Sequence, residues 1–84
     1  MNILIYSKNN CPYCETAINA AFNLKAVVTV KKIDESSENY TELLTEVPGA
    51  RTVPQVFIEG KYIGGSDKFL AWIKETDGGT KVLV

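Results

Sequence analysis

Two cysteines separated by only two residues constrain this chain more than any other feature. Cys11 and Cys14 follow an apolar run at residues 2–6 that predicts a buried strand, and Pro12 suits the first position of a helix. The pair therefore lies where a strand passes into a helix. A disulfide across so short a loop removes little entropy from the unfolded chain, so a structural crosslink explains the pair poorly.

The rest of the chain alternates β-forming runs with stretches of helical composition. We expect strands at residues 2–6, 27–33, 55–59 and 61–63, the last two forming a hairpin around Gly60. We expect helices from Pro12 to residues 23–25, from 38 to 47, and after a cap at Ser66 or Asp67. This β-α-β-α-β-β-α order predicts an α/β fold in which a four-stranded mixed sheet, begun by a right-handed crossover, carries helices on both faces.

Apolar residues at helical spacing predict the buried side of each helix. The expected core residues are Cys14, Ile18, Ala21 and Phe22 in the first helix, Tyr40, Leu43, Leu44 and Val47 in the second, and Phe69, Leu70, Trp72 and Ile73 in the third.

The 84 residues suit one domain spanning positions 1–84. Residues 77–84 are either a loose tail or a few ordered residues packed on the surface. With 9 Lys and Arg against 10 Asp and Glu, no basic face marks a nucleic-acid partner. No apolar run approaches the roughly 18 residues of a membrane span, and the first residues lack the pattern of a secretory signal. We therefore expect a cytoplasmic protein without a membrane partner.

The position of Cys11 suits the chemistry of a nucleophile. A thiolate attacks, and helix N-termini stabilise negative charge through unpaired N–H groups and the helix dipole. Lys8 adds positive potential three residues upstream. We expect a Cys11 sulfur that is open to solvent, with a pKa below the usual value of about 8.5. Cys14 lies one turn deeper and is placed to displace a partner from a mixed disulfide on Cys11.

Two other interpretations of the cysteines compete with this one. Buried cysteines that pack as small apolar residues fit neither the spacing nor the strand-to-helix context. A zinc site requires four ligands, and the chain has no further Cys and no His, so we expect no metal site. A dimer that shares four thiolates stays open on this argument.

Three segments resemble glutaredoxins of the dithiol C-P-Y-C type: YSKNNCPYC, TVPQVFIEGKYIGG and SDKFLAWIK. The resemblance implies a thioredoxin-like fold and a glutathione-dependent reductase of protein disulfides and glutathione mixed disulfides, acting through Cys11 and Cys14. It implies glutathione as co-substrate, no tightly bound cofactor, and electron donation to cellular reductases. We expect a monomer. Disulfide-containing or glutathionylated proteins are the implied partners, with ribonucleotide reductase a common client in the family.

The resemblance also implies a glutathione site around Thr52, Val53 and Pro54, in which the proline is cis and lies beside the cysteines. A cis X-Pro bond exposes the backbone of Val53, which can then pair with an extended peptide as a strand does. From the residues alone, an ordinary trans proline at a strand start is the simpler interpretation.

Charged and glycine-rich positions complete the expected site. Lys8 and Arg51 are the candidate partners of glutathione carboxylates, and Tyr13 flanks the groove. Gly65 allows a ligand close to the backbone. Ser66 and Asp67 begin a helix whose N–H groups suit a carboxylate. Many glutaredoxins have two residues between the glycine pair and the acid, whereas this chain has one, as do some phage-encoded glutaredoxins, so Lys68 competes with Asp67 for that place.

Two rival functions follow from the same residues. One is a [2Fe–2S] carrier that bridges a dimer through Cys11 and glutathione, against which Pro12 argues because cluster-binding members usually have Gly there. The other is a thioredoxin-like donor that a flavoprotein reductase supplies with electrons.

Overall fold

The computed structural model describes residues 1–76, and the expected tail at 77–84 lies outside the described residues. Its elements follow the expected order: β1 (Asn2–Ser7), α1 (Pro12–Asn23), β2 (Val27–Lys32), α2 (Ser37–Glu46), β3 (Gln55–Ile58), β4 (Lys61–Gly64) and α3 (Ser66–Thr76). Element ends differ from the predicted ones by one or two residues. Within residues 1–76, no helix is long and apolar enough to cross a bilayer.

The strands form one mixed sheet in the order β2-β1-β3-β4. β1 pairs with β2 in parallel because α1 returns the chain to the same end of the sheet, while β3 pairs antiparallel with both β1 and β4. The β3–β4 hairpin turns at Glu59 and Gly60, whose φ angles of +52° and +80° are both left-handed. In a two-residue hairpin, a turn with two left-handed residues matches the twist of the strands on either side. The predicted four-stranded mixed sheet is confirmed.

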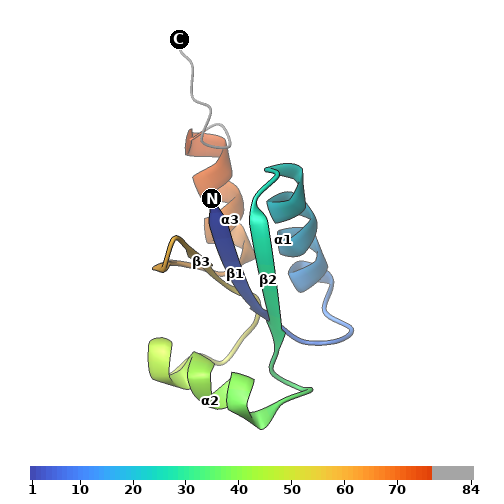
Figure 1. Cartoon of the computed structure of the whole chain (residues 1–84), viewed down its shortest axis with the longest axis vertical. Helices are drawn as coiled ribbons and strands as arrows, with labels where there is room; N and C mark the ends of the chain where they lie inside the picture. The colour runs from blue at the N-terminus through green and yellow to red at the C-terminus, as the bar shows by residue number, and fades with distance from the viewer. Residues whose placement is uncertain (77–84) are drawn as a thin grey trace.

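Alternation along the strands divides the core between the two faces of the sheet. Ile3 and Ile5 join the cluster beneath α1 and α3, whereas Tyr6 joins the cluster beneath α2. Figure 1 shows α2 beyond the end where β1 and β2 finish, with α1 and α3 along the length of the sheet. The first cluster contains Ile3, Ile5, Ala17, Ala21, Val56, Ile58 and Phe69, and the second contains Tyr6, Leu43 and Phe57.

Three residues that were expected in the core are exposed: Phe22, Tyr40 and Leu70. Phe22 follows the buried Ala21, Leu70 follows the buried Phe69, and Tyr40 lies three residues before the buried Leu43. α1 packs through Ala17 and Ala21, whose small side chains let the helix approach the sheet closely. Each short helix therefore buries a narrower stripe than its apolar sequence predicts.

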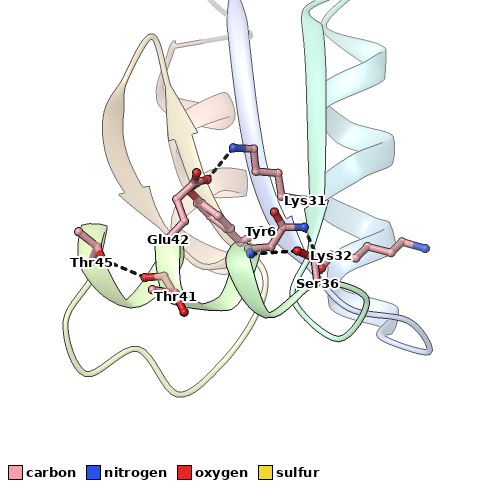
Figure 2. A network of polar contacts seen from close by, with 8 residues as sticks. Tyr6, Lys31, Lys32, Ser36, Thr41, Glu42 and Thr45 are labelled. Atoms are coloured by element: carbon pink, nitrogen blue, oxygen red, sulfur yellow. Dashed lines mark hydrogen bonds and ion pairs between the residues drawn. The ribbon is translucent and has the colours of Figure 1, made fainter.

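A polar network fixes α2 to the sheet (Figure 2). The Tyr6 hydroxyl donates to Glu42 Oε1 at 2.6 Å, and Lys31 Nζ donates to the same oxygen at 2.6 Å. Burial, together with the adjacent Glu42 carboxylate, raises the pKa of Tyr6 well above its usual value. Hydrogen bonds from Lys31 and then from Tyr6 lower the pKa of Glu42. One carboxylate thus joins α2 to both β1 and β2.

Candidate active site

Cys11 occupies the N-cap of α1. Asn10, with a left-handed φ of +55°, turns the chain after β1, and Cys11 itself is extended, with φ −127° and ψ 98°. Asparagine tolerates the left-handed region better than most residues. Cys11 Sγ accepts the backbone N–H of Cys14 at 3.3 Å, in the place of a capping oxygen. The sulfur therefore lies at the positive end of the helix dipole.

The two cysteines form a disulfide and differ in exposure. Cys14 is 1% exposed and Cys11 is 6% exposed, so Cys14 is the deeper of the two, as expected. The expectation that the Cys11 sulfur is open to solvent is wrong for this disulfide form. The sulfur is bonded to Cys14, and the carbonyl oxygen of Val53 lies 3.8 Å away. Both cysteines are among the buried residues of the core.

The Val53–Pro54 peptide bond is cis, as the resemblance implied. This segment forms one wall of a cavity of about 390 Å³ between the first turn of α1 and the start of α3. The cavity is lined by Tyr13, Thr52, Val53, Pro54, Gly65, Ser66 and Asp67. Residues from three distant parts of the sequence, all expected in the site, thus surround one space.

Lys8 and Arg51 lie at a second, smaller cavity of about 90 Å³, which shares Thr52 and Val53 with the first. The Thr52–Val53 segment is therefore a partition with the two cations on one side. Asp67 lines the larger cavity, whereas Lys68 does not. The Lys68 side chain instead packs against Gly64, where an added Cβ would lie 2.9 Å from Lys68 Cγ.

Sequence reasoning missed two residues that organise this region. Gln55 is buried, and its amide donates to the carbonyl oxygen of Thr52 at 3.0 Å. A polar residue at the head of the apolar run QVFI was the available signal. Asn9 ties the loop before Cys11 to the β2–α2 loop, since its N–H donates to Asp34 at 3.0 Å and its side chain donates to Glu35 at 2.9 Å. Only the folded chain reveals that contact.

Across residues 1–76, no group of three or more His, Cys, Asp or Glu side chains gathers as metal ligands. The chemistry-bearing groups that the described residues bring together are the disulfide, the backbone of Thr52–Val53, two cations at the smaller cavity and an acid at the larger one.

Comparisons with known proteins agree on one family. The family model described as Glutaredoxin matches residues 3–63. Glutaredoxin-C4 of Arabidopsis thaliana is 46% identical over 67 residues, covering 77% of this chain and 50% of that protein. The first two curated relatives are thus about twice as long as the part that this chain matches.

Solved structures give the same result. The structure of reduced Escherichia coli glutaredoxin superposes with a TM-score of 0.77 and 30% identity, covering 89% of this chain and 95% of the other. A buckwheat glutaredoxin–glutathione complex superposes with a TM-score of 0.75 and 30% identity, covering 95% of this chain and 81% of the other.

Proposed function

Because the chain belongs to the glutaredoxin family, we propose that it is a glutathione-dependent thiol–disulfide oxidoreductase with Cys11 as its nucleophile. The observation that carries the proposal is the hydrogen bond from the Cys14 N–H to Cys11 Sγ at the N-cap of α1. After reduction, the same N–H and the positive end of the helix stabilise a thiolate at Cys11 and lower its pKa. Cys14 has no such position, because its side chain faces the interior.

With a glutathionylated protein, the Cys11 thiolate attacks the glutathione sulfur of the mixed disulfide. The protein leaves as a thiolate and takes up a proton, and a Cys11–glutathione disulfide forms. A second glutathione thiolate attacks the glutathione sulfur of that disulfide. Glutathione disulfide leaves and Cys11 returns as a thiolate, so the net reaction consumes one free glutathione and joins it to the glutathione that the substrate carried.

With a protein disulfide, Cys11 attacks one sulfur and becomes joined to the substrate. Cys14 then attacks Cys11 and displaces the substrate as a dithiol, and the Cys11–Cys14 disulfide of this structure results. Two glutathione molecules reduce it in turn and leave as glutathione disulfide. Cys14 is suited to this step because it is only three residues away, on the next turn of the same helix.

The two cavities support glutathione as the reducing peptide. Val53 presents backbone N–H and C=O groups beside Cys11, which an extended cysteinyl unit pairs with as a strand does. Lys8 and Arg51 suit the carboxylate at one end of glutathione. The first turn of α3, with Ser66 and Asp67, suits the carboxylate and ammonium at the other end. The complex of buckwheat glutaredoxin with glutathione is a precedent within the same fold.

The setting of this activity is part of the proposal. A dithiol that glutathione regenerates requires a compartment in which glutathione is kept reduced, which supports the cytoplasm. A monomer is part of the same proposal. Glutathionylated and disulfide-bonded proteins are the proposed substrates, and ribonucleotide reductase is the client to test first.

Glutathione-dependent reduction of a glutathionylated peptide tests the proposal, with glutathione disulfide formation followed through glutathione reductase. We expect Cys11→Ser to abolish turnover. Cys14→Ser should retain it with the glutathionylated peptide but lose reduction of an intramolecular protein disulfide. Turnover by Cys11→Ser at the wild-type rate would refute the assignment.

A further inference from the structure

Gln55 is a polar side chain in an otherwise apolar strand, and it is 6% exposed. Its backbone pairs opposite Tyr6 in the sheet, so the side chain is not needed to hold β3 in place. The side chain instead spans two elements. Nε2 donates to the Thr52 carbonyl oxygen at 3.0 Å and lies 3.4 Å from Thr52 Oγ1, while Oε1 accepts from the Tyr62 hydroxyl at 2.7 Å.

These partners fix the orientation of the amide. A carbonyl oxygen only accepts, so the NH₂ group of Gln55 must face Thr52, and the Tyr62 hydroxyl must then donate to Oε1. The Tyr62 ring is held in turn against Phe57, with ring centroids 5.3 Å apart. The chain of contacts runs from the β3–β4 hairpin to the partition between the two cavities.

The Val53 side chain packs against the cluster of Tyr6, Leu43 and Phe57, but the backbone of the Thr52–Val53 partition has few hydrogen bonds to hold it. Among the described residues, no backbone hydrogen bond of the loops involves Thr52 or Val53, and β3 begins only at Gln55. The side chain of Gln55 is thus the hydrogen-bonding anchor of the backbone that lies 3.8 Å from Cys11 Sγ. An unsatisfied NH₂ group in this buried place would be costly, which keeps the contact formed.

We propose that Gln55 is a positioning residue for glutathione: through its amide it holds the Thr52–Val53 backbone at the angle that pairs with the cysteinyl unit of the peptide. This inference rests on the proposed function and deepens it. Gln55 does not touch the reacting sulfurs, and Tyr62 acts behind it by orienting the amide. Its loss therefore weakens glutathione recognition and leaves the reactivity of the Cys11 thiolate intact.

The test is steady-state kinetics of Gln55→Met, which keeps the length of the side chain and removes the amide. We expect the KM for glutathione to rise about tenfold, with kcat at saturating glutathione within about twofold of wild type. The rate of Cys11 alkylation by iodoacetamide should be unchanged. Tyr62→Phe keeps the donor to Thr52 and removes only its orienting partner, so we expect a rise of about two- to threefold.

Tyr6→Phe is the matched control. Tyr6 lies opposite Gln55 in the sheet, but its hydroxyl points to Glu42 rather than to the partition. The substitution therefore removes one hydrogen bond without touching the Gln55 contacts. We expect this variant to be less stable but to keep the wild-type KM, which separates positioning from general destabilisation.

The outcomes are distinct. If Gln55→Met does not fold, Tyr62→Phe decides, since its ring is exposed and only the hydroxyl is removed. If the wild-type protein turns over with glutathione and the folded variants have an unchanged KM, the role of Gln55 is overturned and the proposed function stands. A wild-type protein with no glutathione-dependent turnover would overturn the proposed function itself.

Discussion

Tyr6→Phe isolates the hydrogen bond that anchors α2. The Tyr6 side chain is 1% exposed, and its hydroxyl donates to Glu42 at 2.6 Å. A hydrogen bond to a charged group contributes about 1.5–3 kcal/mol net. Phe fills the same space, so no cavity opens, and Glu42 keeps Lys31 and partial access to water. We therefore take the lower end, a loss of about 1.5 kcal/mol from the free energy of unfolding.

Urea denaturation of the disulfide form, followed by circular dichroism, measures this loss. In a domain of this size, about 1.5 kcal/mol corresponds to a fall in Tm of roughly 6–12 °C. Tyr40→Phe is the control, because Tyr40 is exposed and its hydroxyl has no hydrogen bond within residues 1–76, so its effect should stay within about 0.5 kcal/mol. A Tyr6→Phe protein as stable as the control would refute the reasoning.

Three further predictions follow from the same contacts and from α3. The raised pKa of Tyr6 means that the native state keeps a proton that the unfolded state loses above about pH 10, so stability falls as pH rises beyond that point. Stability of the disulfide form against pH should show this alkaline loss in wild type and less of it in Tyr6→Phe. Because the pKa of Glu42 is lowered, its ionised carboxylate stabilises the fold at pH values above the usual carboxyl range. This stabilisation is lost as the pH falls through the lowered pKa. Lys31→Met should therefore reduce the dependence of the free energy of unfolding on acid pH, measured by urea titration. Gly64→Ala should lower the free energy of unfolding by about 1–3 kcal/mol, because φ at Gly64 is +131° and the new Cβ meets Lys68. Gly65→Ala is the control: Gly65 has no such φ, so this substitution should cost less in the same assay.

Local patterns were enough to predict the order of the elements. The apolar run before Cys11, Pro12 at the first helical position and Gly60 in the hairpin each act over a few residues, and each prediction is confirmed. Exposure of Phe22 and Leu70 was not predictable in this way. Which neighbour of a buried position also packs depends on how closely a helix approaches the sheet, and Ala17 and Ala21 set that distance only after folding.

The site divides along the same line. The N-cap position of Cys11 follows from local sequence, whereas the cis bond before Pro54 required the family resemblance. The anchoring of Thr52 by Gln55 could not be predicted, because it depends on Tyr62 arriving from the neighbouring strand. The low exposure of Cys11 in the disulfide form could not be predicted either, because the neighbouring carbonyl of Val53 lies about forty residues away in the sequence.

The pKa of Cys11 in the reduced protein tests the central claim most directly. Cys14→Ser leaves Cys11 as the single cysteine, and the rate of its alkylation by iodoacetamide can be followed against pH. The N-cap position predicts a half-maximal rate below about pH 7.5, against about 8.5 for the same protein unfolded in denaturant. A folded protein in which Cys11 titrates at or above the unfolded value would contradict the account.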